Sequence, residues 1–142
     1  SAEPAPSALP RCRRASENAK AGVAALEGRW KMNWTREELI AVGIPEKILP
    51  KDLPQKGWVV YEFRAGRFRT IIPNGTTFGR GAYSVEGDVL SLVYDAPAPP
   101  GYIARSVYRH RWSIYRDTLT FSRFPDSDAD LVLLVNPLTR VR

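Results

Sequence analysis

The chain has 142 residues, of which 44% are hydrophobic and 25% are charged, and its formal net charge at pH 7 is +6. This length suits one domain with one core, and no apolar run reaches the about 20 residues that a membrane-spanning helix needs. His110 and Cys12 are the only histidine and cysteine. A single cysteine excludes an intramolecular disulfide, and one residue of each type excludes zinc motifs that need several cysteines and histidines. We therefore expect neither a metal nor a bound cofactor.

The first residues are typical of a segment that leads into a domain. Residues 1–13 are rich in alanine, proline and serine, which predicts a flexible lead-in to one barrel domain at 14–142. Leu9 precedes Cys12 by three residues, as in a lipoprotein acylation site. The two residues between them are proline and arginine, where such a site needs small ones. The lead-in fits a linker, a remnant of cloning or the start of an exported protein, which leaves the compartment open.

A short helix and a strand are the first predicted elements. Residues 14–26 are rich in alanine and predict the helix. In the segment 28–34 every second residue is apolar, so Trp30, Met32 and Trp34 share one face of the predicted strand. The regular alternation makes this strand the first one of the domain.

A second short helix is predicted directly after this strand, at residues 36–42. Thr35 can accept a hydrogen bond from the backbone of Glu38, and the Glu38 side chain can reach back to the backbone of Thr35. Gly43 can end the helix, because glycine adopts the left-handed conformation found after many helices. The sequence therefore places a capped helix between the first two strands.

Alternating apolar residues and short turns predict the remaining strands. These strands are 58–64, 67–72, 77–85, 89–94, 103–115, 118–124 and 131–135. In the sixth strand of the chain, Tyr108, His110 and Trp112 share one face. Arg109 and Arg111 lie on the opposite face, which separates an aromatic inside from a charged outside. Eight strands joined mainly by hairpins predict an all-β protein, an eight-stranded up-and-down antiparallel barrel with a short helix after the first strand.

Three connecting segments carry unusual composition. The segments 44–55 and 95–101 contain three prolines each, so they are candidates for a rim or lid at the barrel mouth. The alternative is that they are plain connections with reduced chain entropy. The acidic segment 126–130 begins like a calcium loop but lacks the glycine and glutamate that such a loop needs, so we expect no calcium there.

Two short features point to a known family of barrels. Gly28-Arg29-Trp30 stands at the start of the first predicted strand, and Arg140 lies just beyond the last one. The segment 26–142 resembles the lipocalins and the wider calycin group in these two features and in its single antiparallel meander. Within that group it resembles a small bacterial protein. The resemblance implies that Arg140 packs over Trp30 and closes the narrow end of the barrel. The chain departs from the family in its missing disulfide, its shorter length and its early helix.

The side chains that we expect to line the barrel lumen are mostly aromatic. They are Trp34, Tyr61, Phe63, Phe68, Tyr83, Tyr94, Tyr108, His110 and Trp112. Buried phenols and imidazoles need hydrogen-bond partners, so a ligand with a polar tip explains this set better than a filled core does. We therefore predict that the lumen binds a small hydrophobic or aromatic molecule, which the tyrosines and His110 orient. A filled core stays as the alternative.

An enzyme of the same fold is the second interpretation. It would be a cofactor-independent cyclase or isomerase of a natural-product, polyketide-like pathway, as in some small barrels of the calycin type. The lumen would hold a flexible substrate in a reactive conformation, which lowers the barrier without a nucleophile. His110 is the candidate general acid or base, and Tyr108 or Tyr83 could polarise a carbonyl. The alternative role for His110 is a hydrogen-bonded residue of the barrel wall.

The outer face is predicted to be basic and solvated. Its expected residues are Glu62, Arg64, Arg67, Arg69, Arg105, Arg109 and Arg111. Nucleic-acid-binding barrels place aromatic and cationic side chains on one face, whereas alternation separates them here, so we expect no nucleic-acid partner. Recruitment of a protein by this face is a third interpretation. The sequence leaves the oligomeric state open.

Overall fold

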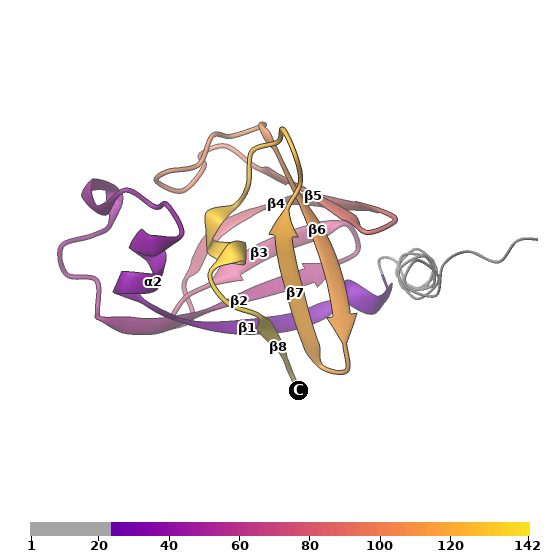
Figure 1. Ribbon diagram of the computed structural model, residues 1–142, viewed down its shortest axis with the longest axis horizontal. Helices are drawn as coiled ribbons and strands as arrows, with labels where there is room; N and C mark the ends of the chain where they lie inside the picture. The colour runs from indigo at the N-terminus through magenta and orange to yellow at the C-terminus, as the bar shows by residue number, and fades with distance from the viewer. Residues whose placement is uncertain (1–23) are drawn as a thin grey trace, which may run out of the picture.

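Eight antiparallel strands close into one barrel, in which each strand pairs with its neighbours along the chain and the last pairs back with the first (Figure 1). The computed structural model describes residues 24–142. The strands are β1 (Gly28–Thr35), β2 (Lys56–Arg64), β3 (Arg67–Ile71), β4 (Thr77–Glu86), β5 (Val89–Tyr94), β6 (Val107–Tyr115), β7 (Thr118–Arg123) and β8 (Leu138–Val141). The predicted all-β, up-and-down barrel is confirmed, as is the short helix after the first strand, α2 (Arg36–Ala41).

Two sequence predictions fall on the part of the chain that precedes residue 24. The lead-in at 1–13 lies outside the described residues. The helix predicted at 14–26 also lies outside them, except for residues 24–26, which are helical.

The strands bury every second side chain, as the sequence alternation predicts. In β1, Trp30, Met32 and Trp34 are buried while the residues between them are exposed. The register of β1 against β2 places Trp30 opposite Tyr61, so both rings face the interior. A slip of one residue would turn every buried side chain of the strand toward water, which is why the burial pattern fixes the pairing.

The predicted eighth strand at 131–135 is wrong. Residues Leu131–Leu134 form a short 3-10 helix, η2, and the last strand is Leu138–Val141, after Pro137. The apolar run 131–135 carries no alternation, and such a run does not distinguish a strand from a helical turn. The Asp130 side chain accepts a hydrogen bond from the Val132 backbone and so caps the helical turn. Arg140, expected beyond the last strand, therefore lies within it.

The sixth strand begins later than predicted, at Val107 rather than at residue 103. Arg105 has a φ of +69°, a left-handed conformation that a regular strand does not allow. Its backbone N–H donates to the carbonyl of Tyr94, at 3.0 Å. The segment 95–106 is therefore one continuous loop that stays attached to the end of β5.

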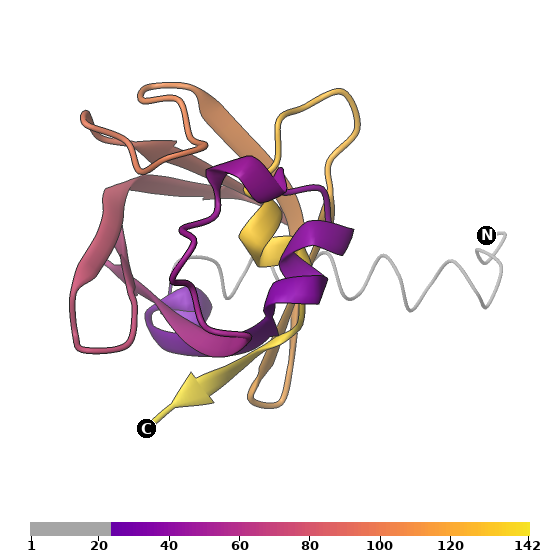
Figure 2. The same ribbon diagram turned by 90° about the vertical axis from the view of Figure 1, so that its left-hand side faces the viewer.

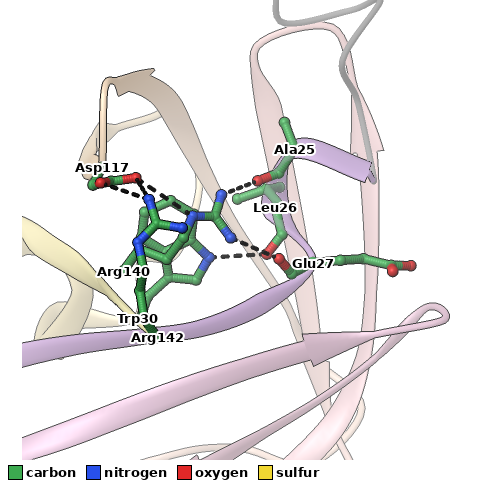
Figure 3. A network of polar contacts seen from close by, with 7 residues as sticks. All are labelled: Ala25, Leu26, Glu27, Trp30, Asp117, Arg140 and Arg142. Atoms are coloured by element: carbon green, nitrogen blue, oxygen red, sulfur yellow. Dashed lines mark hydrogen bonds and ion pairs between the residues drawn. The ribbon is translucent and has the colours of Figure 1, made fainter.

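At one end of the barrel, which we call the motif end, Arg140 and Trp30 belong to one network of contacts (Figure 3). The Arg140 guanidinium lies 4.1 Å from the centre of the Trp30 ring. Its two terminal nitrogens donate to the carbonyls of Glu27 and Ala25, at 3.0 and 2.9 Å. A Cβ atom on Gly28, which has a φ of +119°, would lie 3.1 Å from this guanidinium. The packing of Arg140 over Trp30 that the lipocalin resemblance implies is confirmed, and it explains why glycine precedes the tryptophan by two residues.

The opposite end, which we call the loop end, is covered by short helices and loops (Figure 2). α2, η2 and a 3-10 turn, η1 (Glu46–Ile48), lie across it. The predicted capping box of α2 is present. The Thr35 backbone N–H donates to the Glu38 carboxylate at 3.0 Å, and the Glu38 backbone N–H donates to the Thr35 hydroxyl at 3.1 Å. The Asn136 amide donates to the Asn33 carbonyl and to the Glu38 carboxylate, at 2.8 and 3.0 Å. This bond pair joins the chain after η2 to β1 and α2.

Candidate functional site

Among residues 24–142, one carboxylate is buried inside the barrel, toward the loop end. Asp130 is 0% exposed. Its Oδ2 atom accepts hydrogen bonds from the hydroxyls of Tyr61 and Tyr94, at 2.9 and 2.7 Å. Its Oδ1 atom accepts from the Tyr102 hydroxyl and from the Val132 N–H, the latter at 3.3 Å. Four hydrogen bonds therefore converge on the two oxygens of this one carboxyl group.

These groups come from segments that are far apart in the sequence. Tyr61 lies in the middle of β2, and Tyr94 is the last residue of β5. Tyr102 lies in the loop 95–106, and Asp130 directly precedes η2. The bonds from the tyrosines to Asp130 span 69, 36 and 28 residues. The fold therefore uses two strands and two loops of the loop end to assemble one polar centre.

The three tyrosines are held in their protonated form. Burial raises the pKa of Tyr61, Tyr94 and Tyr102 well above the usual value of 10.0, because an ionised phenolate would lose its hydration inside the barrel. The negative charge of Asp130 raises these pKa values further. The hydroxyls therefore stay hydrogen-bond donors across the physiological pH range.

His110 holds the backbone of this aspartate. Its Nε2 atom accepts a hydrogen bond from the Asp130 N–H, at 2.8 Å, and the side chain is fully buried on β6. An accepting Nε2 carries no proton, so the imidazole is neutral. Burial lowers the pKa of His110 below its usual value of 6.5. We call His110, Asp130, Tyr61, Tyr94 and Tyr102 the Asp130 cluster.

The two tyrosines predicted as catalytic candidates beside His110 lie outside this cluster. The Tyr108 hydroxyl accepts a hydrogen bond from the Ile103 N–H, at 2.9 Å, which ties the loop 95–106 to β6. Tyr83 packs edge-on against Phe63, with ring centroids 5.0 Å apart. Burial raises the pKa of Tyr83, and a hydrogen bond with the Gly66 backbone opposes part of this rise. The structure thus brings Asp130, rather than Tyr108 or Tyr83, to the histidine.

All nine side chains predicted to line the lumen are buried. They are Trp34, Tyr61, Phe63, Phe68, Tyr83, Tyr94, Tyr108, His110 and Trp112. Several rings contact one another edge-on, as Phe68 and Tyr94 do with centroids 5.0 Å apart. The interior wall is therefore aromatic around the Asp130 cluster. The binding role of these residues stays a prediction.

Sequence reasoning missed two members of the cluster. Asp130 falls in the acidic segment 126–130, and Tyr102 lies between the proline-rich segment 95–101 and the predicted strand at 103–115. One local signal did exist, since an aspartate directly before an apolar run is a common helix cap. No local signal indicates that Tyr102 turns inward, because its partner lies 28 residues away.

The outer face carries arginines paired with carboxylates. Glu62 lies on this face as predicted but is only 9% exposed, because Arg29 and Arg69 each bond to it at 2.7 Å. The hydrogen bond from Arg69 lowers the pKa of Glu62 below 4.5, and the one from Arg29 adds to this effect. Arg109 and Arg111 are exposed as predicted, and Arg111 pairs with Asp88 at 3.1 Å.

An open hollow of about 520 Å³ lies on the outer face of β4, β5 and β6. It is lined by Ser84, Glu86, Val89, Ser91, Val93, Val107, Arg109 and Phe124. These strand residues alternate with the inward-facing ones, so the hollow and the Asp130 cluster lie on opposite sides of the barrel wall.

Comparisons with known proteins leave the fold as the firmest basis for classification. No protein-family model, no curated protein and no solved structure matches the chain. Within residues 24–142, no helix is both long and apolar enough to cross a membrane. The chain is a closed eight-stranded antiparallel β-barrel, an architecture consistent with a lipocalin-like fold.

Proposed function

We propose that the barrel binds a small hydrophobic or aromatic molecule in its lumen, as lipocalin-like barrels do. The observation that supports this most is the Asp130 cluster, a carboxylate inside an interior that is otherwise largely apolar. Burial of a carboxylate costs on the order of several kcal/mol, and well-packed apolar residues are often more stable in its place. Binding sites for small molecules combine an apolar wall with a few convergent polar groups, which describes this interior.

The loop end is the route by which a ligand would enter. The motif end is sealed by the stacked Arg140 and Trp30, whereas no strand pairing crosses the loop end. Among its segments, 95–106 contributes Tyr102 to the cluster and is attached to β6 through Tyr108. Opening of residues 96–106 would break these two side-chain bonds and the bond from the Arg105 N–H to the Tyr94 carbonyl, and it would leave the strand pairs of the barrel in place. The predicted lid at 95–101 belongs to this loop.

The second proline-rich segment contacts the same loop. A Cβ atom on Gly101 would lie 2.7 Å from the Ile48 Cδ1 atom in η1. Leu49 and Leu53 from the segment 44–55 also pack against the core. This contact supports a role for both segments at the barrel mouth, with η1 as the surface against which the loop 95–106 closes.

The geometry favours binding over catalysis by the candidate residues. The Nε2 atom of His110 accepts a hydrogen bond from the Asp130 N–H. A general base needs a free lone pair within reach of the reacting proton. In the cyclase or isomerase alternative, His110 could act as a base only after this bond breaks, whereas Tyr108 keeps its O–H to donate because its oxygen accepts from the Ile103 N–H.

Native mass spectrometry of the purified chain, combined with tryptophan-fluorescence titration against a panel of hydrophobic metabolites, tests the proposal. Trp34 and Trp112 are buried in the barrel interior, whereas Trp58 lies against Lys31 on the outer face. A Trp58→Phe variant should therefore retain saturable quenching, and a Trp34→Phe variant should lose part of it. If no panel compound binds saturably and none co-purifies with the protein, the lumen is a filled core and the proposal is wrong.

A further inference from the structure

We propose that the barrel docks on anionic lipid surfaces through a patch on the outer face of β1 to β4, toward the loop end. We call it the outer patch. Its apolar part is Trp58, Val60, Ile71 and Phe78, and its basic border is Lys31, Lys56, Arg69 and Arg80. The proposal is independent of the proposed lumen function, because binding to lipid can be measured without a lumen ligand.

The apolar side chains of the outer patch point away from the barrel interior. They alternate along their strands with residues that face inward, and none of the four belongs to the core cluster or packs against it. The strand register pairs Val60 with Ile71 across β2 and β3. Phe78 is 45% exposed. Neighbouring apolar groups on the outside of a barrel mark a surface that contacts a partner or a membrane.

The same four strands hold the positive charge of the described chain. They carry seven lysine and arginine residues and two glutamates, a net charge of +5, whereas the ten basic and eleven acidic residues elsewhere in 24–142 sum to −1. One of the two glutamates, Glu62, is bonded by both Arg29 and Arg69, at 2.7 Å each. Lys56 and Arg80 form no ion pair within residues 24–142. Anionic lipids attract each such basic residue by about 1 kcal/mol.

The outer patch borders the loop 95–106. Phe78 is the second residue of β4, at the loop end of that strand. A Cβ atom on the next residue, Gly79, would lie 2.8 Å from the Pro99 Cγ atom in the loop. Ile103 of the same loop is 65% exposed, so the apolar surface extends beyond the strands. Docking through the outer patch would therefore place this loop close to the lipid.

The composition of the outer patch favours lipid over a nucleic acid, which is also a polyanion. Barrels that bind single-stranded nucleic acids offer aromatic rings on which bases stack. Here the Lys31 Nζ atom lies over the Trp58 ring, 5.2 Å from its centre, and Val60 and Ile71 are aliphatic. Apolar side chains beside basic ones match the boundary between anionic head groups and acyl chains.

Flotation of the whole chain with lipid vesicles tests the proposal. We expect vesicles of phosphatidylcholine and phosphatidylglycerol to bind the protein at least about tenfold more tightly than vesicles of phosphatidylcholine alone, and added salt to weaken this binding. Equal binding to both vesicles, or binding to neither, would overturn the proposal. So would a labelled oligothymidylate that binds more tightly than the anionic vesicles, since the surface would then be a nucleic-acid site. None of these results bears on the lumen, which the metabolite panel tests separately.

Two pairs of variants locate the binding surface. Arg80→Glu should weaken binding to the anionic vesicles by about tenfold, whereas Arg109→Glu, an equal charge change at an exposed residue of β6, should weaken it far less. Phe78→Ser should weaken binding several-fold, whereas Tyr115→Ser, which removes an exposed ring at the motif end, should bind like the wild type. Equal losses within each pair would show a general attraction of the protein to lipid and would contradict the outer patch. Thermal unfolding establishes that each variant is folded.

Discussion

The backbone N–H of Asp130 donates to the Nε2 atom of His110 across 2.8 Å, so the only histidine of the chain fixes the position of its buried carboxylate. His110 itself is held rigidly, because it lies on β6 and packs edge-on against Phe121, with ring centroids 5.9 Å apart. The loop before η2 has no strand partner of its own beyond a single bridge between Tyr108 and Asp128. The histidine therefore acts as an anchor that turns a loop residue into the interior.

Removal of this anchor should destabilise the protein. A His110→Phe substitution keeps a ring of similar volume but leaves the buried Asp130 N–H without its acceptor, which costs about 1–3 kcal/mol. Chemical denaturation measures the change in the free energy of unfolding. An unchanged midpoint would show that the N–H finds another partner and that His110 is not the anchor.

The stability of the protein should fall in mild acid because of the same residue. The pKa of His110 is lowered in the folded state, so the unfolded chain binds more protons once the pH drops below about 6.5. The contribution is fully present above pH 6.5 and is lost as the pH falls through the lowered folded value. Melting temperatures recorded between pH 7.5 and 5 should decline for the wild type. In the His110→Phe variant this decline should be smaller, and an equal decline would assign it to another group.

Loss of the Tyr94 hydroxyl should cost more stability than loss of the Tyr83 hydroxyl. Tyr94→Phe removes a hydrogen bond to the Asp130 carboxylate and should cost about 1.5–3 kcal/mol. Tyr83→Phe removes a hydrogen bond with the neutral Gly66 backbone, so it should cost at most about 0.5–1.5 kcal/mol. Thermal unfolding of the two variants side by side gives the comparison. Equal losses would mean that the bond to Asp130 contributes no more than a bond to a neutral group.

The closure of the motif end should require arginine specifically. Arg140→Lys keeps the charge but cannot bond two carbonyls while it stacks on Trp30, so we expect a loss of about 1–2 kcal/mol. Arg142→Lys is the matched control, because Arg142 is exposed and bonds only to Asp117 among the residues described. Urea unfolding should separate the two variants. Similar stability of both would contradict a structural role for the stacked guanidinium.

The barrel could be predicted from the sequence because buried and exposed residues alternate along its strands. The alternation around Trp30 in β1 and around His110 in β6 identifies which face is buried, and turn residues mark where each strand ends. The run 131–135 has no alternation, so a strand was predicted where Asp130 caps a helical turn. Tyr102 and Asp130 became neighbours only through the closure of the barrel. Contacts between loops so far apart in the chain leave no periodic signal in the sequence. For this reason the aromatic side chains of the interior were predicted, and the Asp130 cluster was not.

The measurement that tests the central claim most directly is backbone NMR chemical-shift mapping with a ligand that the metabolite panel identifies. The account predicts saturable shifts at the Asp130 cluster, above all at the N–H groups of Asp130, Tyr94 and Tyr102. It also predicts shifts in η1, where Ile48 meets the loop 95–106. Shifts confined to the outer hollow, around Ser91 and Arg109, would show that the molecule binds outside the barrel and would contradict the account.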